Sequence, residues 1–181
     1  MKISTKRLTV CAVLAALTAV TTMAISIPSI ATKGYTNLGD AMVMLSAYLL
    51  GPAAGALVGG LGSALADLLL GYVQYVPITF VVKGIEGLLA AMLFQVLRRK
   101  APLSLVSGLV AGSWMAFGYF ICECFMYGPA AALGDMPANL VQGIVGAVIS
   151  SILWPVVARL GRRAIDSPES YSAIERSEKT T

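Results

Sequence analysis

Apolar residues form five long runs and one shorter run, each ended by glycine, proline or charged residues. A bilayer core needs roughly 20 apolar residues per helix, and fewer where neighbouring helices bury the segment. The runs therefore predict an all-α integral membrane protein with six transmembrane helices, whose short second helix is tilted or buried among its neighbours. These helices are expected over about residues 8–27, 38–50, 53–70, 77–100, 103–126 and 137–163.

Turn-forming and capping residues set the predicted boundaries. Pro28 ends the first helix, because the residue before a proline is pushed out of the α region. Asn37 is placed to cap the second helix, and Asp40 stands in its first turn, where a negative charge suits the helix dipole. Residues 128–136 are predicted to form a loop before the last helix.

Composition agrees with a fold that is solvated by lipid. The chain is 57% hydrophobic and 12% charged, whereas soluble domains carry about 25% charged residues. We expect one transmembrane domain over residues 1–164. Residues 165–181 are polar and are predicted to form a disordered cytoplasmic tail.

The first apolar run also has features of a signal peptide, because Lys2, Lys6 and Arg7 precede it. The run is longer than the usual apolar region of such peptides, and the best cleavage site, near Ala24-Ile25-Ser26, is poor. We interpret the segment as a retained first helix.

Basic residues predict the orientation. They cluster before the first helix, after the fourth and after the sixth, which are all on one side of a six-span protein. Cytoplasmic loops carry the excess of lysine and arginine. Both termini of this multi-pass membrane protein are therefore predicted to be cytoplasmic. In the loops of the opposite, outer side, Lys33 is the only basic residue.

Several function classes find no support in the sequence. The chain has no histidine, the commonest acid–base residue and metal ligand. Cys11, Cys122 and Cys124 all lie in apolar runs and are expected to pack rather than to bind a metal. No phosphate-binding Gly-x-x-x-x-Gly-Lys-Ser/Thr motif occurs. We predict that the chain is not an enzyme and uses no cofactor.

Ionisable residues within membrane helices are costly and point to function. On the predicted topology, all of them lie toward the outer side and none lies in the inner third. Lys83 and Glu86, three residues apart, share one helix face. The set consists of Asp40, Asp67, Lys83, Glu86, Glu123 and Asp135.

Uncharged polar residues repeat this distribution. Asn139 and Gln142 share a face of the last helix. We predict an aqueous pocket that opens outward and is closed toward the cytoplasm, suited to a small polar ring. Alternatively, Lys83 and Glu86 form only an intrahelical ion pair, and Asp40 is only a helix-terminal charge. The predicted substrate-binding residues are Tyr35, Asn37, Asp40, Asp67, Tyr75, Lys83, Glu86, Tyr119, Glu123, Asn139 and Gln142.

Small residues recur every four positions in three of the helices. Gly55, Gly59 and Ser63 form one such row, and Gly108, Gly112 and Ala116 form another; both are expected to pack inside the bundle. The first helix has two such rows, so one can pack internally while the other docks a second membrane protein. These rows are Ala12 with Ala16 and Ala15 with Ala19.

Several motifs together resemble the S components of energy-coupling factor (ECF) transporters. The branch is the one that includes pyridoxine, hydroxymethylpyrimidine and some riboflavin-related S components. The resemblance covers about residues 8–160. The motifs that carry it are Tyr35-Thr36-Asn37-Leu38-Gly39-Asp40, Leu50-Gly51-Pro52-Ala53-Ala54-Gly55-Ala56, residues 59–67, Lys83-Gly84 with Glu86-Gly87, and residues 137–143.

The resemblance implies an ECF S-component-like bundle with an outward-facing vitamin pocket under the loop after the first helix. It implies two kinds of partner, a transmembrane T component and two cytoplasmic ATPase subunits that supply ATP hydrolysis. S components meet the T component through an Ala-x-x-x-Ala pattern on the first helix, which Ala12, Ala15, Ala16 and Ala19 match. It also implies that the subunit topples in the membrane to turn its pocket inward.

The expected function is therefore capture of a small water-soluble vitamin or precursor. A hydroxymethylated pyridine or pyrimidine is favoured over riboflavin, because the predicted pocket has many polar groups and few aromatic residues. Two alternatives remain open: a membrane assembly subunit that binds no small molecule, and a stand-alone carrier without an ATPase partner. Inverted repeats would favour a carrier, and the sequence shows none.

Overall fold

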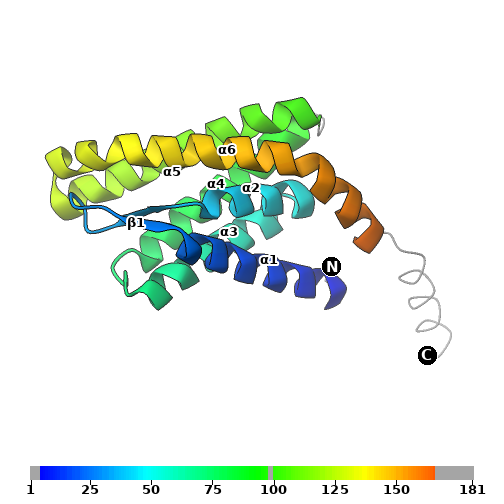
Figure 1. Ribbon diagram of the computed structural model, residues 1–181, viewed down its shortest axis with the longest axis horizontal. Coiled ribbons are helices and arrows are strands. Elements are labelled where there is room, and N and C mark those ends of the chain that lie inside the picture. Colours follow the sequence, from blue (N-terminus) through cyan, green and yellow to red (C-terminus); the bar gives the residue numbers. More distant parts are fainter. Residues whose placement is uncertain (1–4, 98–99, 166–181) are drawn as a thin grey trace.

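The computed structural model describes residues 5–97 and 100–165; residues 166–181 of the predicted tail and the Arg98-Arg99 pair lie outside these ranges. Six helices and a small hairpin make up the described chain (Figure 1). The described start of α1 and end of α6 lie at the same end of the bundle (Figure 1). In chain order the elements are α1 (Thr5–Ala24), β1 (Ser26–Pro28), β2 (Tyr35–Asn37), α2 (Gly39–Leu50), α3 (Pro52–Leu70), α4 (Val76–Val96), α5 (Ala101–Tyr127) and α6 (Pro129–Ile165).

Five of these helices are long and apolar enough to cross a membrane, namely all except α2. Their outer faces carry large apolar side chains; on α3, for example, Leu57, Leu61 and Leu65 are about half exposed. In water, so much exposed apolar surface would favour aggregation. The membrane fold predicted from the apolar runs is confirmed.

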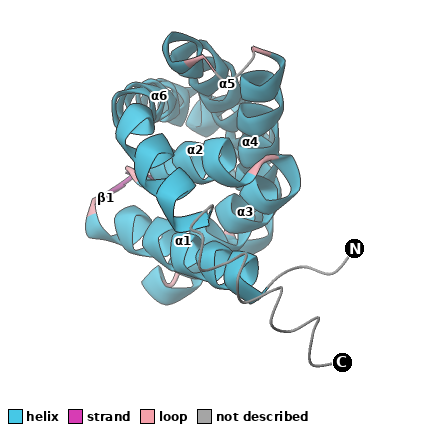
Figure 2. Cartoon of the chain, turned by 90° about the vertical axis from the view of Figure 1, so that its right-hand side faces the viewer, coloured by secondary structure: helices cyan, strands magenta, loops and turns pink. Residues whose placement is uncertain are grey.

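The short helix α2 lies in the middle of the bundle, surrounded by α1, α3, α4 and α6 (Figure 2). Ten of its twelve residues are buried, as predicted for a helix too short to span lipid alone. At its inner end, Tyr48 packs against Phe94 and Trp154, with ring centroids 4.6 and 5.7 Å away. This aromatic cluster fills the cytoplasmic half of the bundle on the predicted orientation.

Glycines bring helix backbones into direct contact, as predicted for an internal packing role. A Cβ added at Gly112 would lie 2.8 Å from the Gly143 Cα, and one at Gly55 would lie 2.9 Å from the Ala47 Cβ. Gly87 approaches the same part of α3, since its added Cβ would lie 2.5 Å from the Gly55 carbonyl oxygen. Close approach compensates for the missing hydrophobic drive between helices in lipid.

Three predicted boundaries were wrong. The first helix ends at Ala24, and residues 26–28 pair instead with residues 35–37 in an antiparallel hairpin. The β-branched Ile25 and Ile27 and the restriction before Pro28 favour extended backbone there. Leu38, not Asn37, occupies the N-cap position of α2, although Asn37 Oδ1 still accepts the Gly39 N–H at 2.8 Å.

The predicted loop over residues 128–136 is the third error. The last helix already begins at Pro129, and Pro137 lies inside it. Pro129 is pre-set for a first helical position, and the Ala-Ala-Ala-Leu stretch after it has strong helix propensity. This extension places Asp135, which lines the pocket described next, within α6.

A polar pocket at the hairpin end of the bundle

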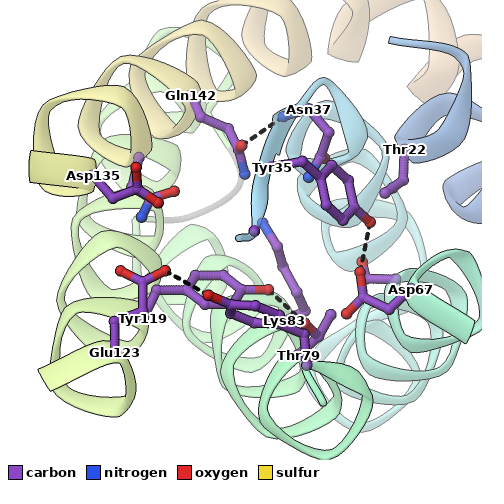
Figure 3. A pocket seen from close by; sticks show the side chains of 14 residues that line it. Thr22, Tyr35, Asn37, Asp67, Thr79, Lys83, Tyr119, Glu123, Asp135 and Gln142 are labelled. Carbon is purple, nitrogen blue, oxygen red and sulfur yellow. Dashed lines mark hydrogen bonds between the residues drawn. The ribbon is translucent and has the colours of Figure 1, made fainter. Parts of the chain in front are cut away.

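A polar pocket opens at the end of the bundle that carries the hairpin (Figure 3). It encloses about 420 Å³, counting its open mouth. Side chains from α1, from the hairpin and its flanking residues, and from α3 to α6 surround it. The lining residues are Thr22, Gly34, Tyr35, Asn37, Ser63, Asp67, Tyr75, Thr79, Lys83, Tyr119, Glu123, Asp135, Asn139 and Gln142.

The hairpin covers one side of the pocket and is held by polar contacts. Asp135, in the extended first part of α6, accepts hydrogen bonds from the hydroxyls of Ser29 and Thr32. Tyr75 donates its hydroxyl to the Thr32 carbonyl at 2.9 Å. The loop between the two strands is therefore tied to both α6 and the start of α4.

Tyr35 and Asp67 form one wall. The Tyr35 hydroxyl donates to Asp67 Oδ1 at 2.6 Å (Figure 3). Burial raises the pKa of Tyr35 well above its usual value, and the charge of Asp67 adds to this. Tyr35 therefore remains a neutral donor at physiological pH and fixes one of the two Asp67 oxygens.

Tyr75, Thr79, Tyr119 and Glu123 form the opposite wall. Thr79 Oγ1 and the Tyr119 hydroxyl lie 2.8 Å apart. The Tyr75 hydroxyl also lies 3.4 Å from Glu123 Oε1. Burial is the main cause that raises the pKa of Tyr75, and the charge of Glu123 acts in the same direction. On this wall, the rings of Tyr75 and Tyr119 supply flat, weakly polar surfaces beside the Glu123 carboxylate.

A buried ion cluster forms the floor. The Lys83 ammonium contacts Asp40 and lies 3.1 Å from Glu86 Oε2. Gln142 donates to Asp40 Oδ1 at 2.9 Å and accepts the Asn37 backbone N–H at 2.7 Å. The three charged side chains are at most 2% exposed. Charges this deep are stable only when they are paired and hydrogen-bonded.

Most of the predicted substrate-binding residues come together in this pocket. Nine line it, and two, Asp40 and Glu86, lie behind Lys83 and do not. Both instead pair with Lys83, and their assignment as substrate-binding residues stays a prediction. The nine are Tyr35, Asn37, Asp67, Tyr75, Lys83, Tyr119, Glu123, Asn139 and Gln142.

Sequence reasoning missed four lining residues: Thr22, Gly34, Ser63 and Thr79. Thr22, Ser63 and Thr79 are single small polar residues within apolar runs, a signal that also occurs at many packing positions. Gly34 lies close to Tyr75, so that an added Cβ would crowd the Tyr75 hydroxyl oxygen at 3.1 Å. Only the folded backbone distinguishes them from packing residues.

The two small-residue rows of α1 face different ways. Ala12 and Ala16 are exposed on the outside of the bundle. Ala19 is buried, and the Ala15 carbonyl oxygen lies 2.6 Å from where a Cβ on Gly62 would be. Ala15 and Ala19 therefore pack against the interior, which corrects the expectation that they also dock a partner. The docking prediction now rests on Ala12 and Ala16.

Comparison with known proteins decides the family. A family model described as "ECF-type riboflavin transporter, S component" matches residues 2–159. The chain belongs to the S components of ECF transporters. This confirms the resemblance seen in the motifs, and it makes the chain a multi-pass cell-membrane protein of a transport system. S components in general are binding subunits and not enzymes. Membership of the family implies a small vitamin ligand, and it implies a T component and ATPase subunits as partners.

Two relatives are similar to this S component over most of their length. An uncharacterized protein of Pyrococcus woesei is 38% identical over 140 residues, which cover 77% of this chain and 93% of the relative. The thiamine precursor transporter HmpT of Lactococcus lactis subsp. cremoris is 33% identical over 157 residues, which cover 86% of this chain and 90% of HmpT.

Proposed function

We propose that this S component captures a small, ring-shaped vitamin or vitamin precursor from outside the cell and delivers it by docking on a T component. The observation that carries the proposal is the pocket itself, which combines tyrosine rings, amides and charged groups at the hairpin end of the bundle. Specific small-molecule sites pair apolar or aromatic walls with a few convergent polar groups.

The polar lining favours a hydroxymethylpyrimidine or pyridoxine over riboflavin. Carboxylates, amides, hydroxyls and an ammonium group make up most of the lining, and tyrosines are its aromatic residues. Such a lining suits a single polar ring better than three fused rings that need broad aromatic walls. The similarity to HmpT, a thiamine precursor transporter, points the same way, whereas the family model is named for riboflavin.

Delivery into the cell requires a route other than a channel through the subunit. Below the ion cluster, Tyr48, Phe94 and Trp154 pack against one another, within a larger cluster of buried apolar side chains. A ligand held above this cluster leaves most directly through the mouth by which it entered. Reorientation of the whole subunit against a partner, with Ala12 and Ala16 as the contact, meets this requirement.

Mass spectrometry of small molecules released from the purified chain tests the proposal. Pyridoxine, riboflavin and a hydroxymethylpyrimidine with an exocyclic amino group are then titrated against the ligand-free protein in detergent. Saturable binding of one single-ring compound is expected. A folded protein that releases and binds none of these compounds would instead indicate an assembly subunit.

A further inference from the structure

The pocket region concentrates negative charge. The carboxylates of the described ranges 5–97 and 100–165 are Asp40, Asp67, Glu86, Glu123 and Asp135. Asp67, Glu123 and Asp135 line the pocket, and Asp40 and Glu86 lie directly behind its floor. Among the described lining residues, Lys83 is the one cation. Its charge is already matched by Asp40 and Glu86, so it adds no net positive charge for an incoming ligand.

Two of the lining carboxylates keep one oxygen free. Asp67 and Glu123 are each 3% exposed. Within the described part of the chain, Asp67 Oδ2 and Glu123 Oε2 have no hydrogen-bond partner. Asp135 differs, because its two oxygens accept from Ser29 and Thr32. A buried acceptor without a donor is costly, so these two oxygens are poised to receive donors from a ligand.

The two free oxygens lie on opposite sides of the pocket (Figure 3). Tyr35 holds Asp67 on one wall, and Tyr75 lies beside Glu123 on the other. Each tyrosine leaves the second carboxylate oxygen of its partner available. A ligand that satisfied both would need hydrogen-bond donors at two separate edges of its ring.

We infer that Asp67 and Glu123 are the two donor-recognising residues of the site, and that the pocket accepts a neutral or cationic ring with donors at two edges while rejecting its phosphate ester. The inference rests on the proposed function and narrows its substrate class. Amino, hydroxymethyl and protonated ring-nitrogen groups all supply such donors. A phosphate group would bring like charge against the carboxylates, a juxtaposition that costs several decades of affinity.

Calorimetric titration of the full-length chain in detergent tests this with matched probes. They are the hydroxymethylpyrimidine with an exocyclic amino group, the same ring without that amino group, and the phosphate monoester of the first. Pyridoxine and its phosphate ester form a second pair. The parent protein should bind each ester at least about a hundred-fold more weakly than the corresponding alcohol. Loss of the amino group should weaken binding roughly ten- to hundred-fold.

Two kinds of variant separate charge from hydrogen bonding. Asp67→Asn and Glu123→Gln keep the shape of the side chain and remove its charge. Each should therefore reduce the ratio between the dissociation constants of the ester and the alcohol by about ten-fold or more. Asp67→Leu and Glu123→Met also remove the acceptor, so one of them should abolish the preference for the amino-bearing ring. Gln95→Ala, at an exposed polar side chain near the other end of α4, should change neither preference.

Thermal unfolding of every variant confirms that only folded protein is compared. If the parent binds an alcohol and its ester equally, or if all four carboxylate variants keep both preferences, the inference is overturned while the proposed function stands. If the folded parent binds neither of these rings nor riboflavin, the proposed function fails and the inference fails with it.

Discussion

Lys83 shows how single residues in this protein combine structural and functional roles. Its ammonium group pairs with two carboxylates beneath the pocket while its side chain forms part of the floor. The sequence allowed two hypotheses for the Lys83 side chain, a contact with the ligand and an intrahelical ion pair with Glu86. The structure supports parts of both, because Lys83 lines the pocket and pairs with Glu86, while Asp40 joins from a different helix.

Removing Lys83 should therefore destabilise the fold as well as weaken binding. Lys83→Met leaves Asp40 and Glu86 buried without a cation, and breaking a buried ion pair costs about 3–5 kcal/mol. We expect a clear fall in the thermal unfolding midpoint in detergent. Adding Asp40→Asn and Glu86→Gln to Lys83→Met removes all three charges, and this triple variant should regain part of the lost thermal stability. Unchanged thermal stability in Lys83→Met would show that the cluster is not a paired buried unit.

The polar residues of the pocket were predictable as a group because their depth along each helix follows from residue counting. Their exact roles were not. Asp40 and Glu86 stand at the right depth, but tertiary packing turns them behind Lys83. Thr22 and Ser63 line the pocket although isolated hydroxyl residues carry no distinctive sequence signal.

At the scale of the elements, the lengths of the apolar runs predicted the six helices. The ends of those helices depend on competition between residues that favour helix and residues that favour extended backbone or turns. The β-branched residues around Ile27 end α1 early and begin the hairpin. Pro137 suggested a helix start, but the preceding alanines extend α6 by two turns to Pro129. Proline is tolerated inside such a helix because neighbouring helices and side chains satisfy the freed backbone groups.

The outer face of α1 carries the docking prediction. Replacing Ala16 by tryptophan should stop vitamin uptake in cells that supply the T component and ATPases, since a bulky side chain prevents close helix approach. Binding to the purified subunit should stay within about two-fold of the parent, because Ala16 is exposed and remote from the pocket lining.

Ala19→Trp is the matched comparison on the inner face. Ala19 is buried, so this variant should unfold at a lower temperature and lose binding together with uptake. Loss of ligand binding in folded Ala16→Trp would assign the outer row to internal packing and contradict the docking prediction.

At the scale of the whole molecule, the hairpin and the described chain ends lie at opposite ends of the bundle (Figure 1), and hairpin residues such as Tyr35 line the pocket. The predicted orientation places the pocket outside the cell and the ends of α1 and α6 in the cytoplasm. In a cysteine-free parent, Lys33→Cys should react with a membrane-impermeant maleimide in intact cells. Lys100→Cys, exposed at the α4–α5 connection, should react only after permeabilisation. The reverse pattern would invert the topology.

The central claim is that the polar pocket under the hairpin binds the transported ligand. Its most direct test is the dissociation constant of the ligand that copurifies with the chain, measured for Asn139→Ala and Gln95→Ala in detergent. Asn139 lines the pocket at 7% exposure, and losing one partner of a buried hydrogen bond costs about 1–3 kcal/mol. The account predicts roughly one to two decades weaker binding for Asn139→Ala and no change for Gln95→Ala. Equal, parent-like dissociation constants for both folded variants would contradict it.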